Sequence, residues 1–290
     1  MNPLTLQSFL NSSMTRLSEL TDRPAHEARI LAAQVCLQTT EWVFAHPEHV
    51  LTSSQCNVLE ILLKRRLLGE PLAKVIGKKA FWKETFFTNE HTLDPRPESE
   101  LIIEAASTHC CNEPHYILEL GVGSGCLILS LLQEFSAALG VGVDLSWEAL
   151  QVANKNAKHL SLTQKINFIQ GQWFGAINSL PTFDLIISNP PYISSHILPK
   201  LPSEVYNYDP HLALDGGLDG VAPYSHFVEQ KIDRLLRPGG LLIMEIGQGQ
   251  EVSILEIFQS TPLTHIDTLK DLQKIPRVLI FKKENQKDNT

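Results

Sequence analysis

Apolar residues recur every three to four positions through the first seventy residues of the chain. One such face consists of Leu6, Phe9, Leu10, Met14 and Leu17. This spacing predicts an amphipathic helix. A second helix is expected with Pro24 in its first turn, and a third begins at the capping residues Thr52-Ser53-Ser54 and ends at Gly69. No strand pattern intervenes, so residues 1–72 are predicted to form a small helical bundle.

The hydrophobic pattern changes after this bundle. Residues 74–94 contain the short aromatic pieces KVIGKKAFW and ETFFTN, which favour β-structure. We expect residues 73–95 to form a β-hairpin that links two domains.

From about residue 97 the chain alternates between strand and helix patterns. Helices are expected at Trp147–His159 and Ser225–Leu236, among others. The expected strands are Tyr116–Leu120, Leu139–Asp144, Ile166–Gln170, Phe183–Ser188, Gly240–Ile246, His265–Leu269 and Arg277–Phe281. This alternation predicts an α/β domain over residues 96–284 with a mostly parallel, doubly wound (Rossmann-like) sheet and a ligand at the carboxyl ends of its strands. The polar tail 285–290 is expected to be frayed.

Composition agrees with a folded protein of this size. Hydrophobic residues make up 43% of the 290 residues, which excludes a disordered chain. No apolar run is long enough to cross a bilayer, and the first residues do not form a secretory signal, so no membrane role is expected. The five cysteines form no CxxC pair and are predicted to be reduced thiols. Together these features predict a cytoplasmic protein.

Charge is unevenly distributed along the chain. The net charge of −8 comprises +2 for residues 1–85 and −10 for residues 86–290. An acidic main body argues against a stable nucleic-acid partner, which would require a basic surface. Lys64-Arg65-Arg66 predicts a compact basic spot on the third helix, although a solvated helical face is the simpler interpretation. The histidines show no metal-binding spacing, and no metal is expected.

A glycine-rich loop follows the first strand of the second domain. Glu119 and Leu120 lead into Gly121-Val122-Gly123-Ser124-Gly125 and then into an apolar helix. Glycines let the backbone turn sharply and approach a ligand more closely than a Cβ would permit. The G-x-G-x-G spacing differs from the pyrophosphate-binding G-x-G-x-x-G, which counts against a NAD-linked dehydrogenase. A tight turn without a ligand is the structural alternative.

Two further residues stand at the ends of the next two strands. Asp144 ends the second strand, where a carboxylate can accept hydrogen bonds from both hydroxyls of a ribose. Trp173 follows the third strand, where its indole can flank an adenine ring. Alternatively, Asp144 or Ser146 caps a helix and Trp173 packs in the core. The three successive strand ends together predict a cofactor that contains adenosine.

This combination resembles the seven-stranded S-adenosylmethionine-dependent methyltransferases. Glu119 and Gly121–Gly125, with Val122 and Ser124 inside the loop, match the first motif of that family. Asp144 matches its ribose-binding acid. The resemblance implies that S-adenosyl-L-methionine is the cofactor and that its methionine end lies over the glycine loop.

The fourth strand runs into the tetrapeptide Asn189-Pro190-Pro191-Tyr192. Two prolines stiffen this loop and remove two backbone donors, which leaves carbonyl acceptors. The Asn189 side-chain oxygen and the Pro190 carbonyl can accept both N–H bonds of a planar amino group, and Tyr192 can lie over its plane. A proline-rich turn that ends a strand is the structural alternative. The motif resembles that of methyltransferases that act on exocyclic or amide nitrogens, and it implies Asn189, Pro190 and Tyr192 as catalytic, all four residues as substrate-binding and Asn189 as a cofactor contact as well.

Two other segments narrow this resemblance. FFTNEHTLDPRPESE and YDPHLALDGGLDG are similar to signatures of the protein-(glutamine-N5) methyltransferases, the HemK/PrmC family, which also has a helical amino-terminal domain. Asp209 stands where that family often has glutamate, and Ser99 where it often has threonine. The resemblance implies that the substrate is the glutamine of the Gly-Gly-Gln motif in class I peptide-chain release factors, and that the helical domain docks the partner. Arg96 and Glu98 are either substrate contacts or structural.

Two alternative functions share these motifs. One is an amino-group methyltransferase that acts on a nucleic-acid base, either guanine of ribosomal RNA or adenine of DNA. The acidic balance of residues 86–290 counts against it. The other is a non-catalytic, cofactor-binding adaptor, which the intact tetrapeptide and glycine loop disfavour.

Overall fold

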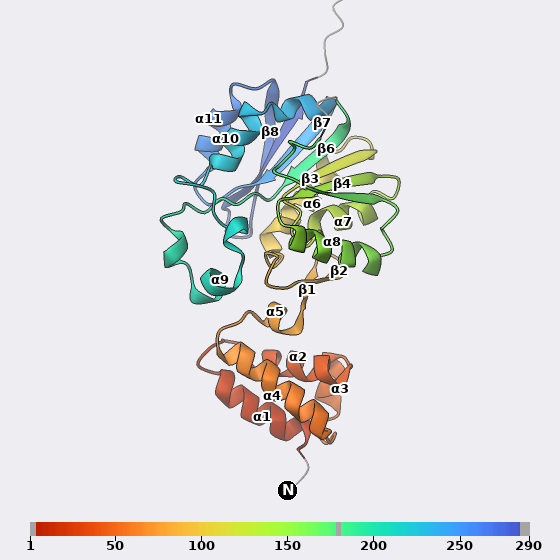
Figure 1. Cartoon of the computed structure of the whole chain (residues 1–290), viewed down its shortest axis with the longest axis vertical. Helices are drawn as coiled ribbons and strands as arrows, with labels where there is room; N and C mark the ends of the chain where they lie inside the picture. The colour runs from red at the N-terminus through yellow and green to blue at the C-terminus, as the bar shows by residue number, and fades with distance from the viewer. Residues whose placement is uncertain (1–3, 178–180, 285–290) are drawn as a thin grey trace, which may run out of the picture. The chain divides into compact units, whose positions relative to one another are not determined.

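The structure is a computed structural model that describes residues 4–177 and 181–284 (Figure 1). Its chain divides into two compact units. The first comprises residues 1–77 together with 203–208, and the second comprises residues 78–202 and 209–290. The expected frayed tail, 285–290, lies outside the described residues.

The first unit is a helical bundle. Its helices are α1 (Leu6–Leu17), α2 (Pro24–Cys36), α3 (Thr40–Ala45), α4 (Ser53–Leu67), α5 (Leu72–Ile76) and α9 (Ser203–Tyr208). Thr52 caps α4 in a reciprocal capping box with Gln55, as its sequence position predicts. Leu6, Leu31 and Leu59 are fully buried in a common core. The expected apolar face of α1 is buried except for Met14, and on α4 the core-facing residues are Leu59 and Leu63.

Helix α9 joins this unit although it lies far along the chain from α5, after β6 of the second unit. The Tyr208 hydroxyl donates to the Leu68 carbonyl oxygen at 3.0 Å, and the Lys74 ammonium donates to the Tyr208 carbonyl oxygen. A guanidinium nitrogen of Arg66 lies 3.9 Å from a carboxylate oxygen of Glu204. The segment that follows the Asn189–Tyr192 tetrapeptide is therefore anchored on the helical bundle.

The predicted basic spot on α4 does not exist as a surface feature. Arg66 is buried and forms an ion pair with Glu27, with Nε 2.7 Å from the carboxylate. Arg65 is half-buried and pairs with Glu70, so Lys64 is the one exposed residue of the three. The helix turns Arg66 toward the core, where a buried cation requires a buried partner.

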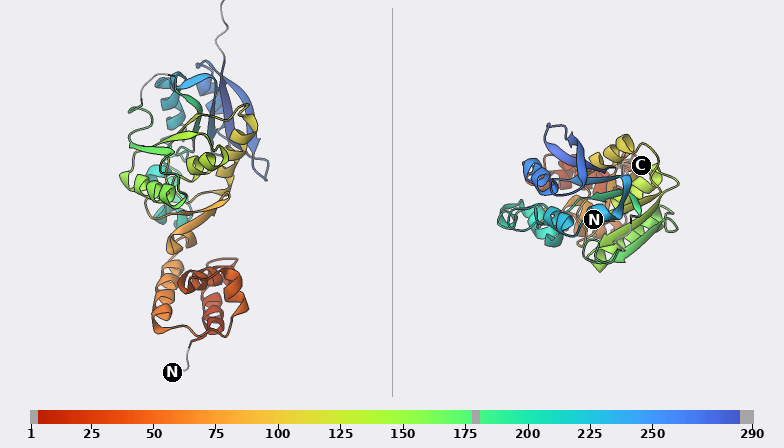
Figure 2. Two further views of the ribbon diagram at one scale, coloured as in Figure 1. Left: turned by 90° about the vertical axis from the view of Figure 1, so that its right-hand side faces the viewer. Right: turned by 90° about the horizontal axis from the view of Figure 1, so that it is seen from above.

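The second unit is built on a seven-stranded sheet, which confirms the predicted fold (Figures 1 and 2). The strand order is β5-β4-β3-β6-β7-β9-β8, and β9 alone of these runs antiparallel to both of its neighbours. The strands are β3 (Tyr116–Leu120), β4 (Leu139–Asp144), β5 (Ile166–Gln170), β6 (Phe183–Ser188), β7 (Leu236–Glu245), β8 (Leu263–Lys270) and β9 (Pro276–Lys283).

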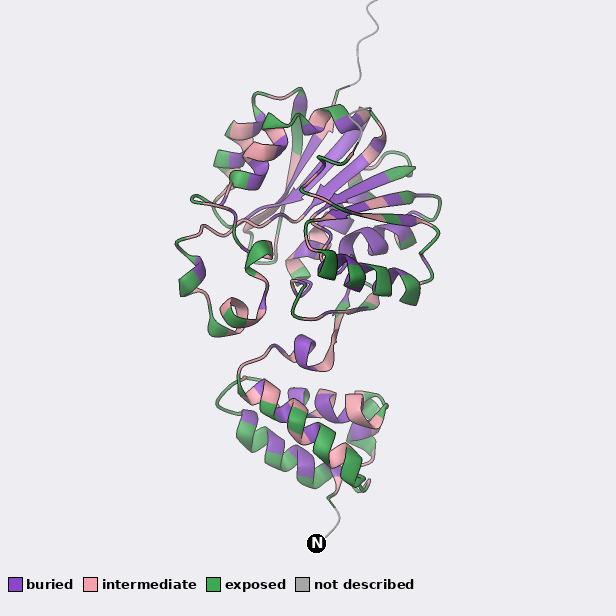
Figure 3. Cartoon of the chain, viewed as in Figure 1, coloured by how far each residue is buried: buried purple, intermediate pink, exposed green. Residues whose placement is uncertain are grey.

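Helices cover both faces of this sheet. One face packs against α6 (Glu100–His109), α7 (Cys126–Glu134) and α8 (Trp147–His159), and the other against α10 (Ala222–Glu229) and α11 (Glu251–Phe258). Each face of the sheet has its own hydrophobic core, and successive residues of a strand belong to opposite cores. Leu185 and Ile187 of β6 face α6 and α7, whereas Ile186 faces α10. Figure 3 shows the central strands buried between these layers. Short 3-10 helices are η1 (Pro97–Ser99), η2 (Leu198–Lys200), η3 (His211–Ala213) and η4 (Ile232–Leu235).

Several segments differ from the prediction. The strand expected over Gly240–Ile246 is β7, which begins four residues earlier, at Leu236, and ends at Glu245. The helix expected over Ser225–Leu236 is α10, which ends at Glu229, and it is followed by Lys231 at a φ of +59° and by η4. A left-handed residue cannot continue an α-helix, so the apolar period is interrupted there. The first β-piece of the predicted hairpin contains a helix, α5, before the strands β1 (Lys78–Phe81) and β2 (Glu84–Phe87).

Asn156 connects the hairpin to the glycine loop. Its buried side chain on α8 exchanges hydrogen bonds with the backbone N–H and carbonyl of Phe87 at 2.7 and 3.0 Å, and it donates to the Ser124 carbonyl at 2.8 Å. The hairpin thus packs beside the glycine loop. Within residues 4–177 and 181–284, no helix combines the length and apolar character needed to cross a bilayer.

Candidate functional site

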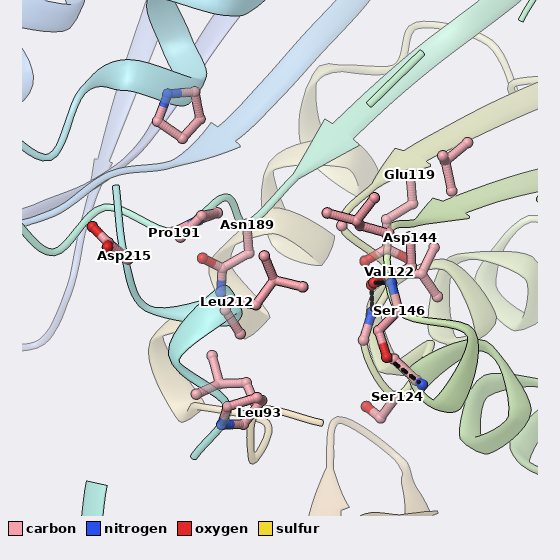
Figure 4. Close-up of a pocket in the computed structure, with 18 of the residues that line it drawn as sticks. Leu93, Glu119, Val122, Ser124, Asp144, Ser146, Asn189, Pro191, Leu212 and Asp215 are labelled. Carbon is pink, nitrogen blue, oxygen red and sulfur yellow. Dashed lines mark hydrogen bonds between the residues drawn. The ribbon is translucent and has the colours of Figure 1, made fainter. Parts of the chain in front are cut away.

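A cavity of about 790 Å³ opens at the carboxyl ends of β3, β4 and β6 (Figure 4). From β3 the chain adds β4 and β5 on one side of the sheet and then returns to add β6 on the other side of β3. The strand order therefore reverses between the neighbours β3 and β6, and ligands of doubly wound sheets bind at such a reversal. All residues that line the cavity belong to the second unit. In Figure 4, Asn189 and Pro191 lie on one side of the cavity, and Glu119, Val122 and Asp144 lie on the other.

The glycine loop forms one wall of the cavity. Gly121, Gly123 and Gly125 have φ values of +78°, +54° and +79°, a region that other residues rarely adopt. A Cβ added at Gly123 would meet no atom within 4 Å, so this glycine leaves open space beside the chain. Gly121, Val122, Gly123 and Ser124 line the cavity, whereas Gly125 packs against α7 and α8.

Two carboxylates lie next to this loop. The Asp144 oxygens accept from the backbone N–H groups of Gly123 at 2.8 Å and Ser146 at 2.9 Å. Ser146, and not Asp144, caps α8, since its hydroxyl accepts from the N–H of Ala149. Each carboxylate oxygen of Asp144 can accept further bonds, and the side chain lines the cavity. Burial raises the pKa of Asp144, and hydrogen bonds from backbone N–H groups oppose that rise.

Glu119 is the deeper of the two acids. Its carboxylate is buried and accepts from the N–H of Ile128 in the first turn of α7 at 3.1 Å. Burial raises the pKa of Glu119 well above its usual range, the helix N–H opposes this, and the Asp144 charge adds to it. A cationic group in the cavity would favour the ionised form. The pair suits a ligand that carries hydroxyls and a positive charge.

The three predicted loops converge at Gly121. A Cβ at this position would lie 3.9 Å from the Trp173 ring and 4.0 Å from the Asn189 carbonyl oxygen. Trp173 lines the cavity and also packs edge-on against Phe227, with ring centroids 4.9 Å apart. It therefore belongs to the core and to the cavity at once. The sheet brings together residues that lie up to 68 positions apart in the chain.

The tetrapeptide contributes unequally to the cavity wall. Asn189 and Pro191 line the cavity, whereas Pro190 is buried and Tyr192 lies outside the lining. The Tyr192 hydroxyl donates to Glu245 at 3.1 Å. Burial and this carboxylate raise the pKa of the Tyr192 phenol above its usual range.

The later signature segment packs directly on the tetrapeptide. Ile193 and Asp215 form a parallel bridge, and a Cβ at Gly216 would lie 2.8 Å from the Pro191 carbonyl oxygen. Gln250 donates to the carbonyl oxygens of Tyr192 at 2.9 Å and Gly220 at 3.1 Å. These contacts explain why glycines are needed at this point of the segment.

The site contains two polar residues whose part the sequence analysis did not recognise. Glu245, the last residue of β7, is fully buried, and Ser99 joins its carboxylate to the Asn189 side chain. Their signal in the sequence was weak: an acid at the end of an apolar strand, as at Asp144, is the only indication for Glu245. Arg96 lines the cavity and forms a 2.7 Å ion pair with the buried Asp209, which fixes it in place. Glu98 does not line the cavity.

Comparison with known proteins places this site in a family. Residues 9–77 match the PrmC N-terminal domain, and residues 113–282 match a methyltransferase domain. The release factor glutamine methyltransferase of Caulobacter vibrioides is 37% identical over 279 residues, which are 96% of this chain and 96% of that protein. The chain belongs to the release factor glutamine methyltransferase family.

A second relative supports this assignment, and one solved structure shares the fold. The release factor glutamine methyltransferase of Bradyrhizobium diazoefficiens is 37% identical over 293 residues and covers 97% of each chain. The crystal structure of a methyltransferase from Pyrococcus furiosus has a TM-score of 0.54 at 20% identity and covers 76% of this chain and 97% of its own. The latter supports the methyltransferase fold. Membership of the family confirms the resemblance predicted from the sequence.

Proposed function

We propose that this protein transfers a methyl group from S-adenosyl-L-methionine to the side-chain amide nitrogen of the glutamine in the Gly-Gly-Gln motif of class I release factors, and so aids translation termination. The observation that carries the proposal is the position of Asn189 across one cavity from Glu119 and Asp144. One side of the cavity suits the cofactor, and the other presents the Asn189 side chain, whose amide oxygen can accept from a planar amide. The names of the near full-length relatives support the same substrate.

The residues present fit this cofactor. The cavity of about 790 Å³ lies in the range of small-molecule sites. We assign the ribose hydroxyls to Asp144, the adenine to the side of Trp173, and the methionine end to Gly121–Gly125 and Glu119, whose charge suits an ammonium group. S-adenosyl-L-methionine supplies an electrophilic methyl group on a sulfonium.

The contribution of the protein to the reaction is placement. An amide nitrogen is a poor nucleophile because its lone pair is delocalised into the carbonyl. We propose that Asn189 Oδ1 and the Pro190 carbonyl oxygen accept the two N–H bonds of the substrate amide. We assign to Tyr192 a place over the plane of this amide. Such orientation supplies up to about 7–11 kcal/mol in well-placed intramolecular reactions. The same acceptors stabilise positive charge that develops on the nitrogen. The nitrogen loses its extra proton to water after the methyl transfer, so no general base is assigned.

We further propose that the helical unit docks the release factor and that the reaction takes place in the cytoplasm. A glutamine on a large folded partner must enter the cavity while the bulk of the partner stays outside, which calls for a second surface. The anchoring of α9 on the helical bundle ties the segment after the tetrapeptide to that docking unit. No membrane and no stable nucleic-acid partner are part of this proposal.

The test is the mass of a purified class I release factor before and after incubation with the enzyme and cofactor. We expect the mass increase of one methyl group, mapped by peptide sequencing to the glutamine of Gly-Gly-Gln, and none in a release factor with alanine at that position. Total RNA and DNA incubated with labelled cofactor serve as competing substrates. Labelling of either nucleic acid without labelling of the release factor would establish the base-methylating alternative, and cofactor binding without any transfer would establish the adaptor.

A further inference from the structure

Glu245 is a buried carboxylate next to the tetrapeptide with no part in the function proposed above. Ser188 pairs with Met244 in the parallel ladder of β6 and β7, so Asn189 and Glu245 leave adjacent strands side by side. Burying an ionised carboxylate is costly unless hydrogen bonds compensate for lost water. Glu245 has two such bonds, from the Ser99 hydroxyl at 2.5 Å and from the Tyr192 hydroxyl at 3.1 Å.

The direction of these hydrogen bonds decides how Asn189 is oriented. An ionised carboxylate only accepts, so Ser99 must use its single proton toward Glu245. The Ser99 oxygen can then only accept from Asn189, and the Asn189 Nδ2 atom lies 2.9 Å from it. The amide nitrogen is therefore committed to Ser99, and Oδ1 is left as the atom available to a ligand in the cavity.

We propose that Glu245 and Ser99 are positioning residues that select the rotamer of the Asn189 amide in which Oδ1, and not Nδ2, faces the substrate nitrogen. The proposal rests on the proposed function, which requires an acceptor at this place. If Nδ2 were turned to the cavity, its N–H donors would face the N–H donors of the substrate amide, and no hydrogen bond could form between them. Glu245 holds the other end of the tetrapeptide as well, through Tyr192, and so sets both ends of the loop with one carboxylate.

A purely structural role for this network would appear as lost stability without a specific effect on turnover. Ser188 offers a matched control, since it is also a buried serine, lies next to Asn189 and donates one hydrogen bond, to the Leu120 carbonyl oxygen at 2.7 Å. Ser188→Ala removes a buried hydroxyl at a similar depth and leaves the bonds of Asn189 in place. Ser99→Thr keeps the hydroxyl, whereas Ser99→Ala removes it.

The first experiment measures turnover of intact release factor by the full chain. We expect Ser99→Ala to lower kcat by about tenfold or more. Without the Ser99 hydroxyl, Asn189 Oδ1 is no longer held toward the substrate nitrogen, and the substrate amide loses its orientation. Cofactor affinity by calorimetry should stay unchanged, Ser99→Thr should retain activity, and Ser188→Ala should retain kcat even if its melting temperature falls. A Ser99→Ala variant with wild-type kcat overturns the proposal, and so does an equal loss of kcat in Ser188→Ala.

The second experiment uses the charge of Glu245. Glu245 is faced by the hydroxyls of Ser99 and Tyr192 and by two charged groups. The Arg277 guanidinium favours the ionised form of Glu245, whereas the Glu98 carboxylate disfavours it. The Tyr224 hydroxyl donates to the backbone carbonyl of Glu245. Burial raises the pKa of Glu245 to about 6. Protonated, it can donate to Ser99, which frees the serine proton for Asn189 Oδ1 and reverses the chain of bonds.

We therefore expect kcat at saturating substrate to fall as the pH decreases through about 6 in the wild type, and we expect this step to be absent in Ser99→Ala. Glu245→Gln, whose amide can donate permanently to Ser99, should show the low-pH rate at neutral pH. The same pH step in Ser99→Ala as in the wild type contradicts the proposal. A wild-type enzyme that leaves the release factor unmodified at every pH refutes the proposed function instead, so the two failures are distinguishable.

Discussion

Gly220 approaches the tetrapeptide so closely that a Cβ at this position would lie 2.4 Å from the Tyr192 carbonyl oxygen. Its φ of +82° is also unfavourable for any residue with a side chain. Gly249 has the same φ of +82°, but a Cβ there would meet no atom within 4 Å. The two glycines therefore separate backbone strain from steric conflict within one protein.

We expect Gly249→Ala to cost about 1–2 kcal/mol of unfolding free energy, the usual penalty of a left-handed alanine. Gly220→Ala should cost about 1–3 kcal/mol more, because it forces the Tyr192 backbone to move, and it should lower turnover as well. Denaturant unfolding of both variants gives the difference. Equal losses would mean that the loop yields to the extra methyl group without cost.

The ribose assignment predicts the behaviour of Asp144→Ala. Each charge-assisted hydrogen bond that this variant loses is worth about 1.5–3 kcal/mol, so binding of S-adenosyl-L-methionine should weaken by at least about tenfold. Asp144 also holds the Gly123 N–H at 2.8 Å, and the loop loosens with it. Calorimetry on a variant with native circular dichroism checks this, and unchanged affinity would remove Asp144 from the cofactor site.

The amide clamp predicts that Asn189→Ala lowers kcat by about 10²–10³, the usual loss for one preorganised polar contact. Cofactor affinity should change much less, because Asp144, Glu119 and Trp173 line the cavity independently of it. Single-turnover methylation of release factor with saturating cofactor measures the step directly. Near wild-type transfer by this variant would exclude the clamp.

Stability should respond to pH through Glu245 in the opposite direction from activity. The folded-state pKa, about 6, lies above the ordinary glutamate value of 4.5, so the folded protein binds the proton more tightly than the unfolded chain. The stability that Glu245 contributes is therefore greatest below pH 4.5 and is lost as the pH rises through about 6. Because a shift of one pKa unit corresponds to about 1.36 kcal/mol, the loss of unfolding free energy amounts to about 2 kcal/mol.

Denaturant unfolding of the wild type and Glu245→Gln between pH 4 and 8 isolates this contribution, since the other carboxylates are common to both. We expect the wild type to lose stability relative to the variant as the pH increases across this window, while its kcat rises. A constant difference in unfolding free energy would show that Glu245 keeps its ordinary pKa.

The anchoring of α9 predicts an effect on the large substrate alone. Tyr208→Phe removes the 3.0 Å hydrogen bond to the Leu68 carbonyl, a loss of about 0.5–1.5 kcal/mol. If the helical unit docks the release factor, the KM for intact release factor should rise. The rate on a short Gly-Gly-Gln peptide should stay low and unchanged. An unaltered KM for the intact partner would separate α9 from docking.

The sequence by itself determined the sheet and most of the cavity wall. Four strands, Tyr116–Leu120, Leu139–Asp144, Ile166–Gln170 and Phe183–Ser188, lie where the apolar pattern predicts them. This pattern is readable because central strands are buried on both faces, and burial requires continuous apolar runs. The carboxyl ends of parallel strands lie at one edge of the sheet. The positions of the strands therefore predict that the residues after them, the glycine loop, Asp144, Trp173 and Asn189, lie close together.

The tertiary structure alone decided the residues that act across distant segments. Ser99 and Glu245 are 146 positions apart, and nothing local in either segment indicates their contact. It arises because β7 is the neighbour of β6 in the sheet and η1 packs beside the strand ends. In the same way, α9 joins the helical bundle from a loop of the catalytic domain, and Arg66 turns inward to Glu27 rather than to solvent. Hydrophobic periodicity specifies which face of an element is buried, whereas the partner of a buried polar group depends on the order in which the elements pack.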